Sequence, residues 1–312
     1  MFSEVKLATV GVGDLDRAIA FYADAFALEE ISRTTVDTDA VSEAWRIPAG
    51  ITGRYAVMGI PGNESGMLRL VEWQPVGDHV RGAPARFQDY GMNGLTFRVR
   101  EINAAWDNLC RSGARDRMKP TYWELEQNLC PWTADATDHD GTALEIFEVV
   151  GEVADSLGPF RTGRDVTEVQ AVTIHSSDAR RSSAFYGALG FEALYDRVIE
   201  QAWALLDLPK GTKLQSVHLI RPGARSSGRI EICHYIGMPG RTLKSRSTPP
   251  ARGPLMMSIR VASLDEACAK VKTHGAKPIG SARYNSPPFG NVSAATFFGP
   301  DDEVIELFEK IA

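Results

Sequence analysis

The sequence predicts an α+β fold built from four related modules, each with a first strand, a helix and further strands. The first observation is the stretch 7–22, where β-type residues at 7–12 give way at Asp14 to apolar residues spaced along one helical face. Asp14 is a favourable N-cap, because its carboxylate can accept the free amide protons of the first helical turn. Two further observations are an internal repeat of this stretch and its alternation with a second pattern.

The repeat begins at Ala171. Residues 171–178 lead into an Ala-Phe-Tyr sequence, with Asp178 in the place of Asp14 and Phe185-Tyr186 in the place of Phe21-Tyr22. Shared Thr, Asp and Ala-Phe-Tyr at fixed offsets are hard to obtain by chance. The chain is therefore internally duplicated.

Module one covers residues 1–75. After its helix, the sequence predicts strands at 55–60 and 67–72, joined by a segment rich in turn-forming residues. Residues 76–88 contain glycine, proline and several charges, and are interpreted as a linker. Module one is thus one strand, one helix and then more strands.

Module two covers residues 88–150. It opens with a predicted strand at 94–99 and continues with a helix that ends at Gly113, where glycine suits the left-handed C′ position. The module closes with the turn Asp138-His139-Asp140-Gly141, which runs into a strand at 143–148. This is the second pattern of the chain.

Modules three and four reuse these two patterns in the same order. Module three, residues 166–236, resembles module one, and module four, residues 250–312, resembles module two. Module four opens with a strand at 256–261 and closes with a strand at 304–309. The order of patterns along the chain is A-B-A-B.

Length and composition set the broad class. A chain of 312 residues exceeds the ~250–300 at which one core stops growing, so we expect two domains, residues 1–150 and 166–312, with a linker at 151–165. The net charge of -6 argues against nucleic-acid binding. The sequence shows neither a signal peptide nor an apolar run of about 20 residues, so we expect a cytoplasmic protein without membrane association. Its four cysteines, at 110, 130, 233 and 268, are then expected to be reduced thiols.

Taken together, these patterns resemble the vicinal oxygen chelate (VOC) superfamily. The residues that carry the resemblance are the Asp-capped helix with Phe-Tyr and the Asp-Gly or Asp-Asp turn before the closing strands at 143–148 and 304–309. The superfamily includes glyoxalase I, methylmalonyl-CoA epimerase, extradiol dioxygenases, and bleomycin- and fosfomycin-resistance proteins. The resemblance implies βαβββ modules that pair into two cup-shaped, partly closed mixed sheets. It also implies a divalent metal, held by one side chain from the first strand and one from the last strand of each module.

The metal ligands that this resemblance implies are only half present. The first-strand positions are Leu7, Gly94, Ala171 and Met256, none of which suits a zinc, nickel or iron site. The last-strand positions are Arg69, Glu145, Glu231 and Glu306. An extradiol dioxygenase needs histidines at the first-strand positions of modules three and four, so that site is not supported. No metal is predicted, and a divalent metal with other ligands stays open.

Pairing the modules in chain order would give a first cup from modules one and two. This cup would contain Arg69 and Glu145. One interpretation is a structural ion pair at the floor of a cup without activity. The other is that Arg69 binds an anionic group of the substrate with two hydrogen bonds. The residues do not separate these alternatives.

The second cup, from modules three and four, would contain Glu231 and Glu306, with His175 further along the same strand face as Ala171. Two carboxylates that face each other away from water cannot both ionise cheaply, so one should have a raised pKa. Such a pair could abstract a proton next to a carbonyl. The alternative is that both glutamates only hold strands together. Because superfamily members pair modules within or between chains, a swapped pairing would mix these cups.

Four further residues are candidates for substrate binding. His218 lies on a predicted strand of module three. Tyr122, Trp123 and Tyr284 lie in segments before the closing strands, where superfamily members have loops at the rim of the cup. Aromatic rings there would suit an apolar or aromatic substrate, and ordinary packing between modules is the alternative.

Three hypotheses about function follow, all with a small molecule as the partner. The first is an isomerase, epimerase or lyase that acts on a small oxygenated metabolite through Glu231, Glu306 and His175. The second is a protein that binds or sequesters a small molecule without catalysis. The third is a metal-dependent dioxygenase or glyoxalase-type lyase with non-standard ligands such as His175 or His218. A homodimer is an open alternative to a monomer.

Overall fold

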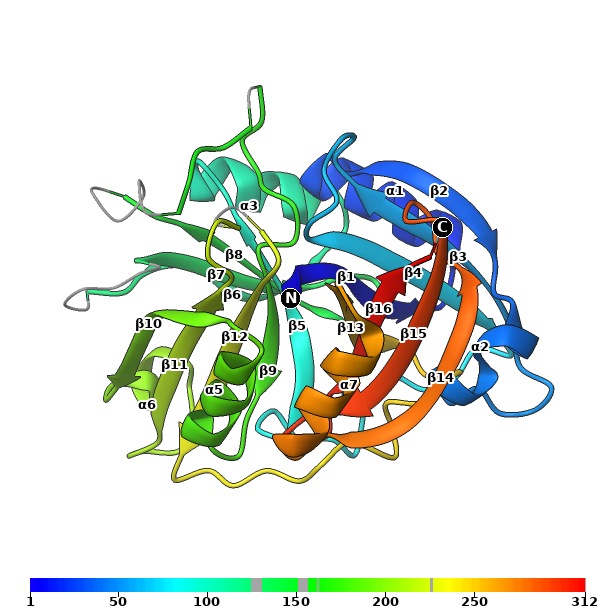
Figure 1. The fold of residues 1–312 in the computed structure, drawn as a ribbon. Helices are drawn as coiled ribbons and strands as arrows, with labels where there is room; N and C mark the ends of the chain where they lie inside the picture. Colours follow the sequence, from blue (N-terminus) through cyan, green and yellow to red (C-terminus); the bar gives the residue numbers. More distant parts are fainter. Residues whose placement is uncertain (125–130, 151–156, 162, 225–226, 312) are drawn as a thin grey trace.

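The computed structural model describes residues 1–124, 131–161, 163–224 and 227–311 except 151–156, and within these residues it contains two curled sheets of eight strands each. Figure 1 shows the two sheets side by side, with helices on their outer faces. The predicted α+β fold with cup-shaped mixed sheets is confirmed. Part of the predicted linker, residues 151–156 and 162, and Cys130 lie outside the described residues.

Each module contributes four strands to one sheet. Module one consists of β1 (Phe2–Val12), α1 (Leu15–Phe26), β2 (Glu29–Thr35), α2 (Thr38–Trp45), β3 (Thr52–Gly59) and β4 (Met67–Gln74). Module two consists of β5 (Gly91–Arg98), α3 (Ile102–Arg111), β6 (Arg115–Tyr122), β7 (Trp132–Thr137) and β8 (Ala143–Glu148). Module three consists of β9 (Ala171–His175), α5 (Ala179–Ala188), β10 (Glu192–Ile199), α6 (Ala202–Leu205), β11 (Lys213–Ile220) and β12 (Arg229–Ile236). Module four consists of β13 (Gly253–Val261), α7 (Leu264–Thr273), β14 (Lys277–Asn285), β15 (Asn291–Phe298) and β16 (Val304–Lys310).

The sheets pair the modules differently from the prediction. One sheet has the order β14-β15-β16-β13-β1-β4-β3-β2, so module one pairs with module four. We call it the outer-module cup. The other sheet has the order β10-β11-β12-β9-β5-β8-β7-β6, so modules two and three pair, and we call it the inner-module cup. The predicted pairing in chain order is wrong, because the first strands β1 and β5 join β13 and β9 in antiparallel pairs.

Modules that are consecutive in the chain meet through their helices instead. The Tyr22 hydroxyl on α1 donates to Asp138 Oδ2 at 2.9 Å, and the Tyr186 hydroxyl on α5 donates to Glu303 Oε1 at 2.5 Å. Phe26 stacks on Phe97 with ring centroids 3.8 Å apart. The halves 1–150 and 166–312 therefore each give one module to each cup, and a single half contains no complete cup.

The repeated helix start has the predicted structure. Asp14 and Asp178 are the N-caps of α1 and α5, and their side chains accept from the backbone N–H groups of Arg17 and Arg181, both at 3.0 Å. Helix α2 was not predicted, because it is only eight residues long. It carries Trp45 into the outer-module cup, where the Thr296 hydroxyl fixes it by donating to Ala44 O at 2.6 Å.

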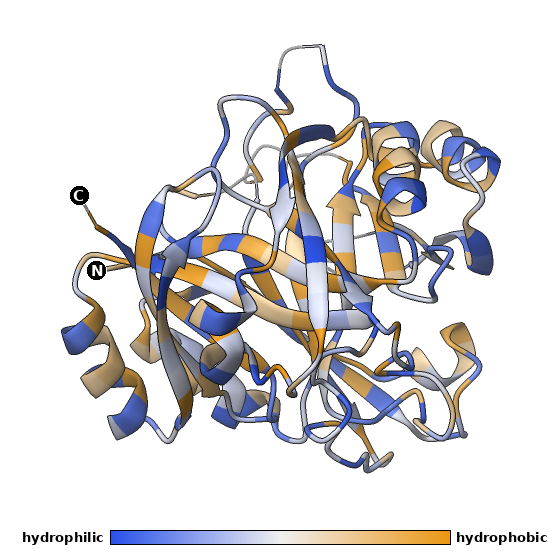
Figure 2. Cartoon of the chain, turned by 90° about the vertical axis from the view of Figure 1, so that its right-hand side faces the viewer, coloured by the Kyte–Doolittle hydropathy of each residue, from blue (hydrophilic) through white to orange (hydrophobic). Residues whose placement is uncertain are grey.

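Hydrophobic side chains fill the space between sheets and helices, and in Figure 2 hydrophobic and hydrophilic residues alternate along the strands. Cys110, Cys233 and Cys268 are free thiols, as predicted. In the part of the chain that the structure describes, the helices are too short or too polar for any of them to cross a lipid bilayer.

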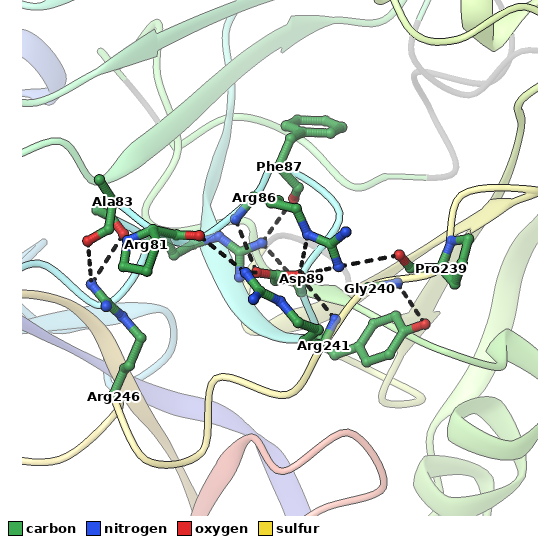
Figure 3. A network of polar contacts seen from close by, with 12 residues as sticks. Arg81, Ala83, Arg86, Phe87, Asp89, Pro239, Gly240, Arg241 and Arg246 are labelled. Carbon is green, nitrogen blue, oxygen red and sulfur yellow. Dashed lines mark hydrogen bonds and ion pairs between the residues drawn. The ribbon is translucent and has the colours of Figure 1, made fainter.

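Polar contacts join the connection between modules one and two to the connection between modules three and four, as Figure 3 shows. The buried Asp89 carboxylate accepts from the backbone N–H groups of Arg86 and Arg241, both at 2.9 Å. Arg246 donates to the carbonyl groups of residues 79, 80, 82 and 83. This network holds Phe87, whose ring packs edge-on against His175 and Tyr235 at the wall of the cup.

Candidate functional site

Three carboxyl groups share one cavity in the inner-module cup. Asp135 on β7, Glu145 on β8 and Glu231 on β12 line a cavity of about 90 Å³, together with Ser216, His218 and Cys233. Asp135 and Glu145 are direct partners in the antiparallel ladder, a position that brings side chains on one face close together. The cavity therefore concentrates acidic groups from two modules.

Glu231 is held by hydroxyl groups from the two first strands. Its Oε2 accepts from Thr173 Oγ1 at 2.9 Å and from Thr96 Oγ1 at 3.1 Å. The register explains this contact, since Thr173 is paired with Glu231 on neighbouring parallel strands, and Thr96 is paired in the same way with Glu145. His218 Nε2 lies 3.8 Å from Glu231 Oε1 on the other side. Glu231 is thus fixed at the cup floor.

Two carboxyl groups in this cavity, Asp135 and Glu145, have raised pKa values. Burial, and then the neighbouring Glu231 and Asp135, raise the pKa of Glu145 well above its ordinary value. Burial also raises the pKa of Asp135 to about 6, with Glu231 acting in the same direction and the Arg117 charge opposing it. At neutral pH Asp135 is mostly ionised, whereas the pKa of Glu145 is shifted toward the protonated form. Carboxyl groups whose pKa values differ in this way are suited to act as a base and an acid.

The raised pKa of Asp135 predicts a specific pH dependence of stability. The folded protein holds this proton up to about pH 6, while the unfolded chain releases it near the ordinary value of 3.8. The stabilisation is therefore present at low pH and is lost as the pH rises through this interval. Urea unfolding across the interval should show a smaller stability decrease with rising pH in Asp135→Asn than in the wild type. The exposed Asp196→Asn variant should match the wild type, and identical slopes in all three proteins would contradict this assignment.

His175 lies in an adjoining cavity of about 60 Å³ that is also lined by Phe87, Arg117 and Glu145. Its Nδ1 is 2.9 Å from Phe87 O and 3.0 Å from Arg81 Nη2. Burial and then the Arg81 charge lower the pKa of His175 well below its ordinary value, so the imidazole is neutral. His175 is therefore at the edge of the inner-module cup and near Glu145.

The outer-module cup is closed by a buried ion pair. Arg69 Nη2 lies 2.9 Å from Glu306 Oε2, and both side chains are 1% exposed. Glu306 also accepts from Ser258 Oγ at 2.6 Å, Trp45 Nε1 at 2.9 Å and the Tyr284 hydroxyl at 2.8 Å. Burial alone would raise the pKa of Glu306, but Arg69 and these hydrogen bonds bring it below its ordinary value. This carboxylate has no free position for a substrate.

The structure corrects the predictions about which candidate residues lie in the same cup. The prediction that Glu231 and Glu306 share a cup is wrong, because β12 and β16 belong to different sheets. Arg69 does form a structural ion pair, but its partner is Glu306 and not Glu145. The structure instead brings Glu145, Glu231, His218 and Trp123 together in one cavity, and Arg69, Glu306 and Tyr284 in the other cup.

The predicted aromatic rim is only partly present. Trp123 is 7% exposed and lines the acidic cavity with Tyr195 and Tyr235. Tyr122 is 50% exposed and packs on Trp132 with ring centroids 5.1 Å apart, so it lies outside the cavity lining. Tyr284 is buried and donates to Glu306 at the floor of the outer-module cup. Strand alternation explains the difference between the neighbours Tyr122 and Trp123.

Comparison with known proteins agrees with this architecture. Residues 5–146 match the model of the Glyoxalase/Bleomycin resistance protein/Dioxygenase superfamily. This match lies within modules one and two of the chain. Among solved structures, glyoxalase I from Zea mays is similar, with a TM-score of 0.65, 16% identity, and coverage of 98% of this chain and 92% of that chain. A putative dioxygenase from Bacillus subtilis subsp. subtilis str. 168 has a TM-score of 0.61, 14% identity, and coverage of 100% and 86%. At these identities the likeness shows the fold alone, and no curated protein matches the chain.

The residues of this chain do not fit the divalent metal that the resemblance implied. Gly94 and Ala171, the first-strand positions of the inner-module cup, carry no donor atom, and Glu231 Oε2 is already hydrogen-bonded to two hydroxyls. In the outer-module cup, the Arg69 cation occupies one of the four ligand positions. Across the described residues, no three His, Cys, Asp or Glu side chains are arranged to hold a metal ion. The same finding argues against a metal site in which His175 or His218 is a non-standard ligand.

Sequence reasoning missed Asp135, Thr96 and Thr173. Asp135 lies in the strand before the closing strand, and nothing in its neighbours marks it as different from an exposed strand residue. Two-residue alternation from Gly94 and Ala171 places Thr96 and Thr173 on the same strand faces, so this signal was present in the sequence. The role of their hydroxyl groups follows from the strand register, which pairs Thr173 with Glu231 and Thr96 with Glu145.

Proposed function

We propose that the inner-module cup catalyses proton transfer on a small oxygenated molecule, as an isomerase, epimerase or lyase does. The observation that carries this proposal is the pair Asp135 and Glu145, whose pKa values are raised to different extents within one cavity. Groups with separated pKa values in one site are suited to act as base and acid on the same substrate. The proposal no longer involves Glu306.

The proposed step uses the two carboxyls on opposite ends of a substrate carbonyl unit. Ionised Asp135 removes a proton from the carbon next to the carbonyl, and protonated Glu145 donates its proton to the carbonyl oxygen. The product is an enol. Return of the proton from Asp135 to carbon, with transfer of the enol O–H proton back to Glu145, completes an isomerisation or epimerisation and restores both carboxyl groups. Glu231, held in place by Thr96 and Thr173, lies beside Glu145 and contributes to the raised pKa of Glu145.

The wall of the cavity indicates the kind of substrate. Trp123, Ile199, Leu214 and Tyr235 line it alongside the carboxyls, and Arg117 lies at the adjoining side near Asp135. An apolar wall with a few polar groups suits a small molecule with one hydrophobic and one oxygenated end. This apolar wall also supports the second candidate, a protein that binds such a molecule without changing it.

A solvent-exchange experiment separates the two candidates. Small hydroxy and keto compounds that raise the melting temperature would be incubated with the protein in D₂O, and deuterium incorporation next to the carbonyl would be followed by proton NMR. The enzyme proposal expects incorporation that is lost in Glu145→Gln and Asp135→Asn and kept in the exposed Glu192→Gln variant. Binding without incorporation would support the second candidate and contradict the first.

A cytoplasmic location and a homodimer stay predictions from the sequence. Both cups are completed within one chain, so a dimer is not required to form either of them.

A further inference from the structure

The outer-module cup contains a second cavity, which is separate from the acidic cavity and has a different chemistry. Its volume is about 190 Å³, and three aromatic side chains, Trp45, Tyr55 and Tyr284, form much of its lining. The Trp45 ring lies 6.4 Å from the Tyr55 ring at 62° and 5.7 Å from the Tyr284 ring at 83°. The Trp45 ring therefore stands at a steep angle to each of the two tyrosine rings.

The charges around this aromatic cavity favour a cation. Asp37 is the single charged side chain in its lining, beside Thr34, Thr35 and Asn285, and it lies at the exposed edge as the N-cap of α2. The Arg69 charge behind the rings is offset by Glu306 at 2.9 Å. The cavity thus combines one carboxylate with electron-rich ring faces and no uncompensated positive charge.

One of these aromatic rings already contacts a cation of the protein itself. The Arg69 guanidinium at the floor of the outer-module cup lies 4.6 Å from the centre of the Trp45 ring. Its ion pair with Glu306 keeps it there, so it does not fill the cavity itself. Among the described residues the Tyr55 hydroxyl makes no hydrogen bond, which leaves it available to a ligand.

We propose that this aromatic cavity binds a small organic cation, such as a quaternary or alkylated ammonium group. Ring faces attract such cations through their quadrupole, and the attraction is strongest where water is excluded. Glu306 is fully engaged below the rings, so the cavity offers binding and no proton transfer. The proposal is independent of the proposed function, because it concerns the other cup.

The direct test compares choline with 3,3-dimethyl-1-butanol, which has the same shape and no charge. Isothermal titration calorimetry on the full chain should give about tenfold tighter binding of choline, within the range of cation–π contributions. Binding should be unchanged in Glu145→Gln, which separates this site from the acidic cavity. Equal affinity for the two compounds, or no choline binding at millimolar concentration, would overturn the proposal.

Matched cap variants test the role of the carboxylate. Asp37→Asn and Asp178→Asn make the same change at two helix N-caps, and asparagine preserves the cap in both. Only Asp37→Asn should weaken choline binding, by about threefold to tenfold for one charge near the surface. Tyr55→Leu should weaken it as well, while binding of the neutral compound changes little. Equal effects of the two cap variants would show that Asp37 plays no part.

Discussion

Replacing Arg69 with methionine is expected to lower the free energy of unfolding by about 3–5 kcal/mol. The change leaves the Glu306 carboxylate buried without its cation, and an unpaired buried charge is far more costly than the pair itself is favourable. Chemical denaturation followed by fluorescence would measure the loss. Acid should reduce it, because protonation of Glu306 removes the unpaired charge.

The control for this variant is Arg33→Met, which breaks an exposed ion pair with Glu30 and Asp16. Its effect should be several-fold smaller, since exposed pairs are screened by water and salt. The double variant Arg69→Met with Glu306→Gln should recover part of the stability. If Arg69→Met and Arg33→Met were equally mild, the outer-module cup would not depend on its ion pair.

Replacing Glu145 with glutamine is expected to lower the rate of proton exchange about 10²–10⁴-fold once a substrate is found. Glutamine keeps the shape and hydrogen-bonding capacity of the carboxyl but cannot deliver a proton to the carbonyl oxygen. Because the side chain can still contact substrate, KM should change little and kcat should carry the loss. The rates are measured by deuterium incorporation at substrate saturation.

The exposed Glu192→Gln variant in the same sheet is the control and should keep the wild-type rate. A loss confined to KM would mean that Glu145 binds substrate and transfers no proton. Full activity of Glu145→Gln would remove Glu145 from the mechanism altogether.

The two cups show how one position changes the chemistry of a shared architecture. Arg69 in module one corresponds to Glu231 in module three, and Glu306 corresponds to Glu145. With arginine, the opposing glutamate forms an ion pair and its pKa falls. With a glutamate at this position, burial and then the neighbouring Glu231 raise the pKa of the opposing Glu145. The carboxylate of the outer-module cup is therefore neutralised by an arginine, whereas the inner-module cup holds acidic groups without such a partner at the corresponding position.

The sequence was sufficient for the modules and insufficient for their pairing. Asp14 and Asp178 mark helix starts through hydrogen bonds to residues three positions further along the chain. These hydrogen bonds do not depend on which modules pair. The pairing depends on which first strands meet, and β1 and β5 offer similar edges to both β9 and β13. The residues of these strands do not show which partner strand each will pair with. Glu231 was therefore predicted to share a cup with Glu306, whereas it shares the inner-module cup with Glu145.

The same limit applies to the site. The last-strand glutamates followed from the resemblance to the superfamily, and a raised pKa was expected for the pair Glu231 and Glu306 in one cup. Asp135 was not found, because its importance comes from standing opposite Glu145 in the ladder between β7 and β8. Trp45 was not found either, since α2 brings it to Glu306 from more than half the chain away.

The most direct measurement of the central claim is a carbon-13 NMR titration of the side-chain carboxyl groups in the wild type and in Glu145→Gln. Burial raises the pKa of Glu303 to about 7, so its resonance should be up-shifted in both proteins. We predict a further glutamate resonance that titrates well above the ordinary range in the wild type and is missing from the variant. If the wild type and the variant showed the same up-shifted glutamate resonances, Glu145 would have an ordinary pKa and the proposed mechanism would be wrong.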